Sequence, residues 1–420
     1  MSGTLDAAPP LPATTAAPGG RALFAQRRFV TFWLGQTVSR VGDGAYQVAL
    51  GWTVYRLTGS TAAMGTLMAL NFLPQVVFAL VGGAVADRLP RRTVIVAADS
   101  VAAAVVCALA LLAAADRLTL PLMLAAAVLL GTVTAFYGPA YAAMNRDVLD
   151  DEEFRKANSV FTATGNLARL AGPLLAAVAF GAGGASLVLG LNAASFAFSA
   201  VAMAVLEPVP RRAAQPSGGV RRELAEGLRH TRANPWIGVV VAVSLAANIA
   251  CLAPYTVLLP ALVRRAHGGV GTLGLLSAAE IGTVLLASLA IGRARRIRAR
   301  AALFGLAAAI GAGTALMGVL GGHRAVLFAA VVLVGAGLSF DIIENTLLQK
   351  LVPEHLLSRV YSVNMTLSYS LLPLGYLLAG ILARRVGAPA VLLGGGVLLL
   401  ALCACAALTP AARRLDAIHC

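Results

Sequence analysis

Long apolar stretches, separated by short polar or turn-forming clusters, make up most of the chain. A helix needs about 20 apolar residues to cross the roughly 30 Å hydrocarbon core of a bilayer, where its backbone polar groups must be satisfied internally. The pattern predicts twelve such helices, at residues 29–55, 62–86, 93–115, 119–144, 157–180, 185–206, 235–262, 271–292, 301–320, 325–349, 358–382 and 388–408. We therefore expect an all-α membrane protein with twelve transmembrane helices.

Basic residues are distributed unevenly between the loops that join these helices. With the N-terminus in the cytoplasm, 24 of the 33 Lys and Arg residues fall in inside segments and 7 in outside loops. Cytoplasmic loops of membrane proteins carry such an excess of positive charge. The distribution predicts a multi-pass membrane protein with cytoplasmic N- and C-termini. The composition, rich in Ala and Arg and poor in Lys, indicates a bacterial source and hence the bacterial cell (inner) membrane.

The longest polar segment lies in the middle of the chain, begins rich in Pro and Gly, and continues as a basic amphipathic stretch. It leaves six predicted helices on either side. The expected organisation is a disordered cytoplasmic tail at 1–28, an N-terminal six-helix bundle at 29–206, a cytoplasmic linker at 207–234, a C-terminal six-helix bundle at 235–408 and a cytoplasmic tail at 409–420.

A weak internal repeat relates the two halves. A shift of 203 residues places the polar segment Val148–Val160 over Leu351–Val363, and in the same register Gly172 meets Gly375. Two parallel repeats joined by a cytoplasmic linker are typical of one large class of secondary transporters. The repeat therefore predicts two pseudo-symmetric six-helix bundles.

Composition narrows the function classes. Only 12% of the residues are charged, the mean hydropathy is +0.82, and a soluble domain carries about 25% charged residues. The net charge of +15 follows the loops, so it predicts membrane topology and no nucleic-acid partner. Neither a P-loop nor an HExxH or GxSxG motif occurs, and the five cysteines show no metal spacing. We expect no enzyme activity, no cofactor, no metal and no disulfide.

One polar interruption, GAVADRLPRR at residues 83–92, is unusually dense. A clamp that follows the positive-inside rule explains its arginines but not the aspartate that directly follows a helix. The segment resembles the signature loop of the major facilitator superfamily, Gly-x-x-x-Asp-Arg-x-Gly-Arg-Arg, with Pro90 in place of the second glycine. The resemblance implies the major facilitator fold and a cytoplasmic gating latch that ties span 2 to the second half, formed by Gly83, Asp87, Arg88, Arg91 and Arg92. We expect Asp99, early in span 3, to complete this latch.

Two further segments, residues 32–50 (FWLGQTVSRVGDGAYQVAL) and residues 351–363 (LVPEHLLSRVYSV), resemble the macrolide-efflux and enterobactin-exporter branch of that superfamily. Gly172-Pro173 corresponds to the start of the helix-packing motif of its antiporters, although alanines replace the last two glycines. The resemblance implies efflux of an amphipathic small molecule, such as an antibiotic, drug or siderophore, by alternating access. Import or facilitated diffusion of a small metabolite by the same fold is the alternative.

Charged side chains within the predicted spans are candidates for coupling or substrate binding, because burying a charge in the membrane is costly. Asp43 lies within span 1, with Arg40 three residues earlier on the same helical face. The two side chains are either a structural ion pair or part of a protonation site.

Four more charges lie in later spans. Glu280, near the middle of span 8, has no basic neighbour within a helical turn and is a candidate proton or cationic-substrate site. Asp341 and Glu344 share one face of span 10, where interfacial ion pairing and transport are both open. Arg169 in span 5 reaches one of these acids only if the two halves touch. We expect a monomer whose partners are a small-molecule substrate, protons as the coupling ion, and the lipid bilayer.

Overall fold

The computed structural model describes residues 20–147, 151–207, 220–294 and 297–417, nearly all of them helical. The first half is built mainly from long helices. They are α1 (Gly20–Ala25), α2 (Arg27–Thr58), α3 (Thr61–Arg88), α4 (Arg91–Ala114), α5 (Leu120–Asp147) and α6 (Asp151–Val205).

The second half is built from shorter pieces. They are α7 (Val220–Ala233), α8 (Pro235–Ala247), the π-helical η1 (Asn248–Leu252), α9 (Ala253–Arg265), α10 (Val270–Arg293), α11 (Ala299–Leu320), α12 (Arg324–Leu338), α13 (Phe340–Leu351), α14 (Glu354–Tyr369), α15 (Leu372–Val386), α16 (Ala388–Leu408), α17 (Pro410–Arg413) and the 3-10 helix η2 (Arg414–Ala417).

Ten helical segments of the described chain are long and apolar enough to cross a membrane. One of them, within α6, is 50 residues long and reverses direction at Gly183 and Gly184, whose backbone angles are not helical. The charged α2 is not among the ten, although its 32 residues exceed the length that a span needs. The chain is thus an all-helical multi-pass membrane protein; twelve crossings follow if α6 counts twice and α2 once.

Both expected tails are partly helical. The tail at 1–28 lies largely outside the described residues, but Gly20–Ala25 form α1, whose Leu23 is buried among aromatic residues of α2 and α6. After Leu408, α17 and η2 bury Ala412 and Leu415 against the second half. These short helices form because their few apolar side chains find hydrophobic surface to cover.

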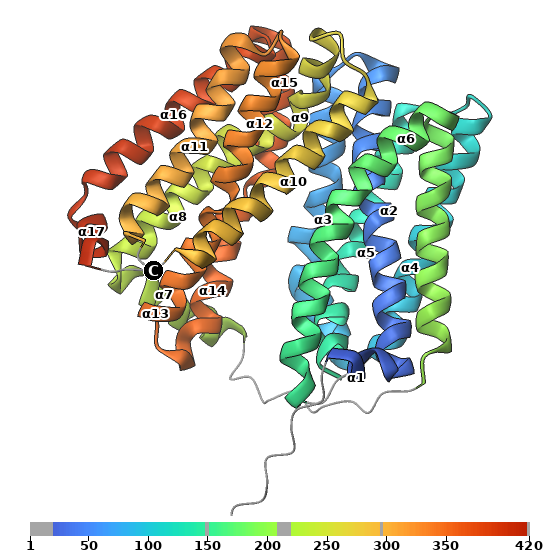
Figure 1. Cartoon of the computed structure of the whole chain (residues 1–420), viewed down its shortest axis with the longest axis horizontal. Helices are drawn as coiled ribbons and strands as arrows, with labels where there is room; N and C mark the ends of the chain where they lie inside the picture. Colours follow the sequence, from blue (N-terminus) through green and yellow to red (C-terminus); the bar gives the residue numbers. More distant parts are fainter. Residues whose placement is uncertain (1–19, 148–150, 208–219, 295–296, 418–420) are drawn as a thin grey trace, which may run out of the picture.

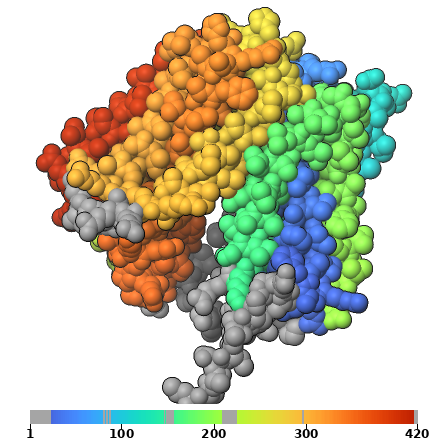
Figure 2. All heavy atoms as spheres, in the orientation of Figure 1, coloured from blue at the N-terminus to red at the C-terminus, as the bar shows by residue number. Residues whose placement is uncertain are grey.

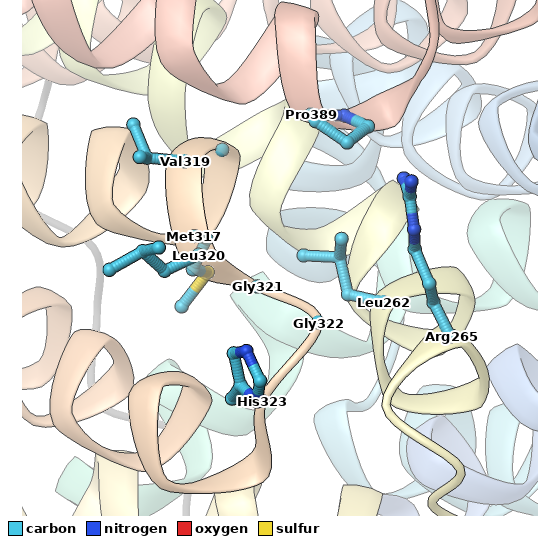
Figure 3. A pocket seen from close by; sticks show the side chains of 10 residues that line it. Leu262, Arg265, Met317, Val319, Leu320, Gly321, Gly322, His323 and Pro389 are labelled. Carbon is cyan, nitrogen blue, oxygen red and sulfur yellow. The ribbon is translucent and has the colours of Figure 1, made fainter.

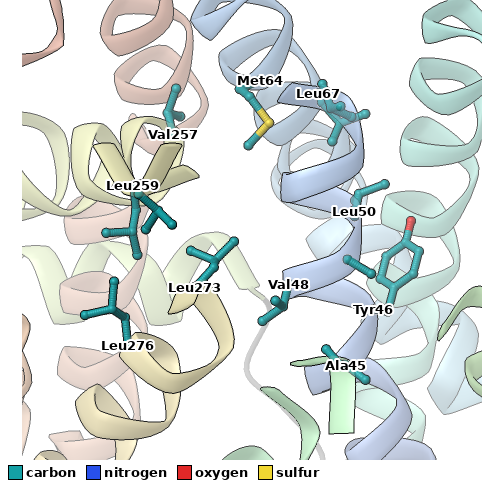
Figure 4. Packing of buried hydrophobic residues seen from close by; sticks show 14 of the residues in the cluster. Ala45, Tyr46, Val48, Leu50, Met64, Leu67, Val257, Leu259, Leu273 and Leu276 are labelled. Carbon is teal, nitrogen blue, oxygen red and sulfur yellow. The ribbon is translucent and has the colours of Figure 1, made fainter. Parts of the chain in front are cut away.

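The structure has two ends that differ in packing. The terminal face, defined as the end that carries α1, α7 and α17, contains two separate hydrophobic clusters, one in each half. The opposite face, which carries the α2–α3 and α9–α10 loops, contains a single cluster built by both halves. Figure 4 shows Val48 of the first half facing Leu273 of the second, with Leu259 and Leu276 behind Leu273.

Close backbone approach between the halves seals the opposite face. The Thr61 hydroxyl of α3 donates to the Gly380 carbonyl of α15 at 3.1 Å. A Cβ atom added to Gly274 of α10 would lie 2.5 Å from the Pro173 carbonyl oxygen of α6. Small residues permit such contact between membrane helices. Between the halves, Figure 2 shows the molecule hollowed on the terminal face and filled on the opposite one.

Candidate transport site

Arg169 of α6 and Glu280 of α10 bring opposite charges within electrostatic range of each other across the two halves. The Tyr255 hydroxyl of α9 donates to Glu280, and Tyr255 is only 6% exposed. Arg169 is exposed and lies within electrostatic range of Glu280. The halves do touch, as the prediction for Arg169 requires, because Pro173, one helical turn further along α6, packs on α10.

Arg40 and Asp43 do not form the structural pair that their spacing allowed. The Arg40 guanidinium carbon lies 5.0 Å from the centroid of the Tyr141 ring, and no ion pair of the described residues joins it to Asp43. Asp43 is half-buried, with Arg40 and Asp99 within electrostatic range. The cation–π contact holds the arginine beside the acid without neutralising it directly.

A buried hydrogen-bond chain connects four helices of the first half. The Ser199 hydroxyl of α6 donates to an Asp99 carboxylate oxygen of α4 at 2.6 Å. Gln36 of α2 donates from Nε2 to the Ser199 oxygen at 3.1 Å, and the Tyr137 hydroxyl of α5 donates to Gln36 Oε1. Asp99 is 2% exposed. Its contacts in this structure are therefore with the bundle interior, and its assignment to the gating latch stays a prediction.

The arginines of the signature loop cap helices of their own half. Arg91 pairs with Asp147 and also donates to the Ala143 carbonyl, both at the end of α5. Arg92 donates from Nε to the Met203 carbonyl at 2.9 Å and also to the Ala204 carbonyl, at the end of α6. Cations are favourable at such carbonyl-rich helix ends.

The remaining latch residues contribute less to the described contacts. Arg88 is exposed, and the side-chain placements of Gly83 and Asp87 lie outside the described residues. The terminal face is open in this structure, so a latch that closes it stays a prediction.

Gly172 and Pro173 lie where three helices meet. A Cβ atom on Gly172 would be 2.7 Å from the Gly44 Cα atom of α2, so only glycine permits this approach. The Pro173 carbonyl in turn faces Gly274 of α10. The two residues thus set the packing of α6 against both α2 and the second half.

Asp341 and Glu344 lie in α13, and neither forms an ion pair in the described part of the chain. Asp341 is exposed, whereas Glu344 is 6% exposed and accepts a hydrogen bond from Asn364 Nδ2 of α14 at 2.8 Å. The interfacial ion pairing that remained open for these acids is absent from the described residues.

Two pockets lie away from all these carboxylates, on the opposite face. Figure 3 shows the first, of about 290 Å³, with Arg265 and His323 at its edge and Leu262 and Met317 on its wall. The second, of about 380 Å³, adjoins it and is lined by Arg264 and Arg265. Neither contains an acidic side chain, so they are not candidates for proton coupling.

Sequence reasoning missed Gln36 and Ser199, the middle of the hydrogen-bond chain. Polar residues within apolar helices were the available signal, and Gln36 lies seven residues before Asp43 on the same face of α2. A lone serine such as Ser199 carries no such signal, because its hydroxyl is as often bonded to its own helix.

Comparisons with known proteins agree with this geometry. The family model described as Major Facilitator Superfamily matches residues 32–375. The multidrug efflux pump Tap of Mycolicibacterium fortuitum is 28% identical over 89% of this chain and 94% of its own length. Macrolide efflux protein A of Streptococcus pyogenes is 22% identical over 93% and 97%.

Solved structures share the fold. A point mutant of the nucleoside transporter NupG superposes with a TM-score of 0.73 at 13% identity, over 91% of this chain and 99% of that chain. A bacterial homologue of the iron transporter ferroportin in an inward-facing state gives 0.69 at 16% identity, over 90% and 98%. At such identities the likeness shows the fold alone.

Proposed function

Because the chain belongs to the Major Facilitator Superfamily, we propose that it exports an amphipathic small molecule, such as an antibiotic, drug or siderophore, by proton-coupled alternating access. The family and the matching relatives are transporters of small molecules across membranes, and two of those relatives are named as efflux proteins. We further propose the bacterial inner membrane, a monomer and the absence of enzyme activity.

The one-sided closure of the molecule carries this proposal. Both halves build one apolar seal at the opposite face, whereas their clusters are separate at the terminal face. With cytoplasmic termini, this arrangement is the inward-open state, in which cargo enters the hollow from the cytoplasm. Export then requires the seal to part while the terminal face closes.

The Arg169–Glu280 contact is suited to link cargo to that movement. Arg169 attracts Glu280 electrostatically across the two halves, so a cationic cargo group that approaches Glu280 competes with Arg169 for the carboxylate. A proton on Glu280 weakens the same attraction across the halves. Asp43 is the second proposed proton site, since no direct ion pair of the described residues neutralises it.

The energetics require few such groups. One proton that moves down a potential of 100 mV releases about 2.3 kcal/mol, which corresponds to roughly a fifty-fold concentration ratio. One titrating carboxylate therefore suffices to drive useful export.

Accumulation of labelled drugs in cells without their own efflux pumps tests the proposal. Cells that express the protein should hold less of some drug than vector controls, and a protonophore, Asp43→Asn or Glu280→Gln should abolish the difference. Asp116→Asn is the matched control, since Asp116 is an exposed loop acid with a φ of 54° that asparagine also accepts. Drug accumulation above that of the vector control would instead indicate import. An export activity that does not change with the protonophore would refute proton coupling.

A further inference from the structure

Asp341 and Glu344 differ from Asp43 and Glu280 in having no basic neighbour. Asp43 has Arg40 and Glu280 has Arg169 within electrostatic range. Asp341 and Glu344 interact with each other, with Asn364 and with nearby tyrosines, but with no Lys, Arg or His of the described residues. Acids at membrane depth need a compensating partner.

A buried amide points to what that partner is. Asn364 is 3% exposed and donates from Nδ2 to Glu344, while its Oδ1 atom has no hydrogen-bond partner. Burying an unpaired acceptor beside a carboxylate costs free energy. A bound cation would satisfy both the Asn364 Oδ1 atom and the Glu344 carboxylate. Ser339 and Ser368, within about one helical turn of Asp341 and Asn364, also have buried hydroxyls without a partner.

The helices that carry Asp341 and Asn364 are each interrupted within two turns of these residues. The segment that carries Asp341 breaks at Ser339, between α12 and α13, and the segment that carries Asn364 breaks at 370–371, between α14 and α15. The Ser368 carbonyl beside the second break accepts a hydrogen bond from Asn248 of the π-helical η1 at 3.1 Å. In transporters, Na⁺ and H⁺ are coordinated where membrane helices are broken.

We propose that Asp341, Glu344 and Asn364 bind a monovalent cation, Na⁺, in the C-terminal half. The donors are all oxygens, which suits a hard cation. The described residues contain no group of three or more His, Cys, Asp or Glu side chains that could hold a metal, so a divalent transition metal fits poorly. This site does not depend on the direction of transport or on proton coupling at Asp43 and Glu280.

Binding of ²²Na⁺ to the purified full-length protein tests the site directly, together with thermal unfolding in NaCl, KCl or choline chloride at equal ionic strength. We expect about one Na⁺ per chain and a melting temperature that is higher in NaCl than in choline chloride by roughly 1–3 °C. Glu344→Gln and Asn364→Ala should each lower ²²Na⁺ binding at least tenfold and remove the Na⁺-specific shift.

Two controls separate this result from a folding defect and from the proposed export mechanism. Asp341→Asn changes an exposed side chain and should weaken Na⁺ binding without a change in melting temperature in choline. Glu280→Gln, the same chemical change at an acid that has Arg169 nearby, should retain full Na⁺ binding. Equal melting temperatures in all three salts, or stabilisation by acid alone, would overturn the site and assign the acids to protons.

Discussion

The two halves share one fold but treat their buried polar groups differently. In the N-terminal half, Asp99, Ser199, Gln36 and Tyr137 form a continuous hydrogen-bond chain across α2, α4, α5 and α6, and the break in α6, at Gly183 and Gly184, lies where that helix reverses direction. In the C-terminal half, three membrane segments are interrupted, at η1, Ser339 and 370–371, and two acids lie beside them without a base. A satisfied network rigidifies a bundle, whereas an interrupted helix bends easily. The first half is therefore expected to move as a rigid body and the second to deform.

The largest expected effect is at the buried ion pair between Arg91 of α4 and Asp147 of α5 in the first half. Arg91 and Asp147 are 10% and 4% exposed, so Arg91→Ala leaves a buried carboxylate without its main partner. Removal of one member of such a pair costs about 3–5 kcal/mol. We expect a fall in the melting temperature of the purified protein, measured by tryptophan fluorescence. The double variant Arg91→Ala/Asp147→Ala should recover part of the loss; if it recovers none, the pair does not stabilise the bundle.

The repeat-related glycines Gly172 and Gly375 compare the halves at equivalent positions. A Cβ atom on Gly172 meets the Gly44 backbone at 2.7 Å, whereas one on Gly375 meets the Ala253 Cβ atom at 3.0 Å. Gly172→Ala must push two helices apart and should cost about 1–3 kcal/mol. Gly375→Ala should cost less, because its nearest neighbour is a side chain in the more deformable half. Equal costs in parallel thermal melts would remove the proposed difference in stiffness.

Sequence patterns predicted the helices that the two halves share. They did not predict that the halves differ in their buried hydrogen bonds and in the interruption of their helices. Apolar runs placed the helices, and the 203-residue shift paired Gly172 with Gly375, because helix length and close packing are written in local composition. The contact of Arg169 with Glu280 and the pairing of Asp99 with Ser199 depend on which helices become neighbours. No local pattern specifies that, so the sequence did not predict the hydrogen bond from Ser199 to Asp99.

The hydrogen-bond chain itself gives a smaller expected effect. Ser199→Ala removes the donor to Asp99 and the acceptor for Gln36, and a lost buried hydrogen bond costs about 1–3 kcal/mol in total. Ser195→Ala, one turn earlier and bonded only within α6 in the described contacts, should cost less and is the matched control. If the Ser199 and Ser195 variants lose the same stability in thermal unfolding, the hydrogen-bond chain does not rigidify the first half.

The smallest change in stability is expected at the two ion pairs near the terminal face. Comparing them distinguishes a contact that stabilises the fold from one that positions a helix. Arg28 and Glu207 are 48% and 70% exposed, so Arg28→Ala should cost at most about 0.5 kcal/mol. Arg359 and Glu226 are only 31% and 20% exposed and attach α7 to α14, where Gly227 also packs on the Arg359 backbone. Arg359→Ala should therefore loosen α7 and make α7 easier for a protease to cleave, with little change in melting temperature. Equal proteolysis of the two variants would show that Gly227 packing alone holds α7 on the C-terminal half.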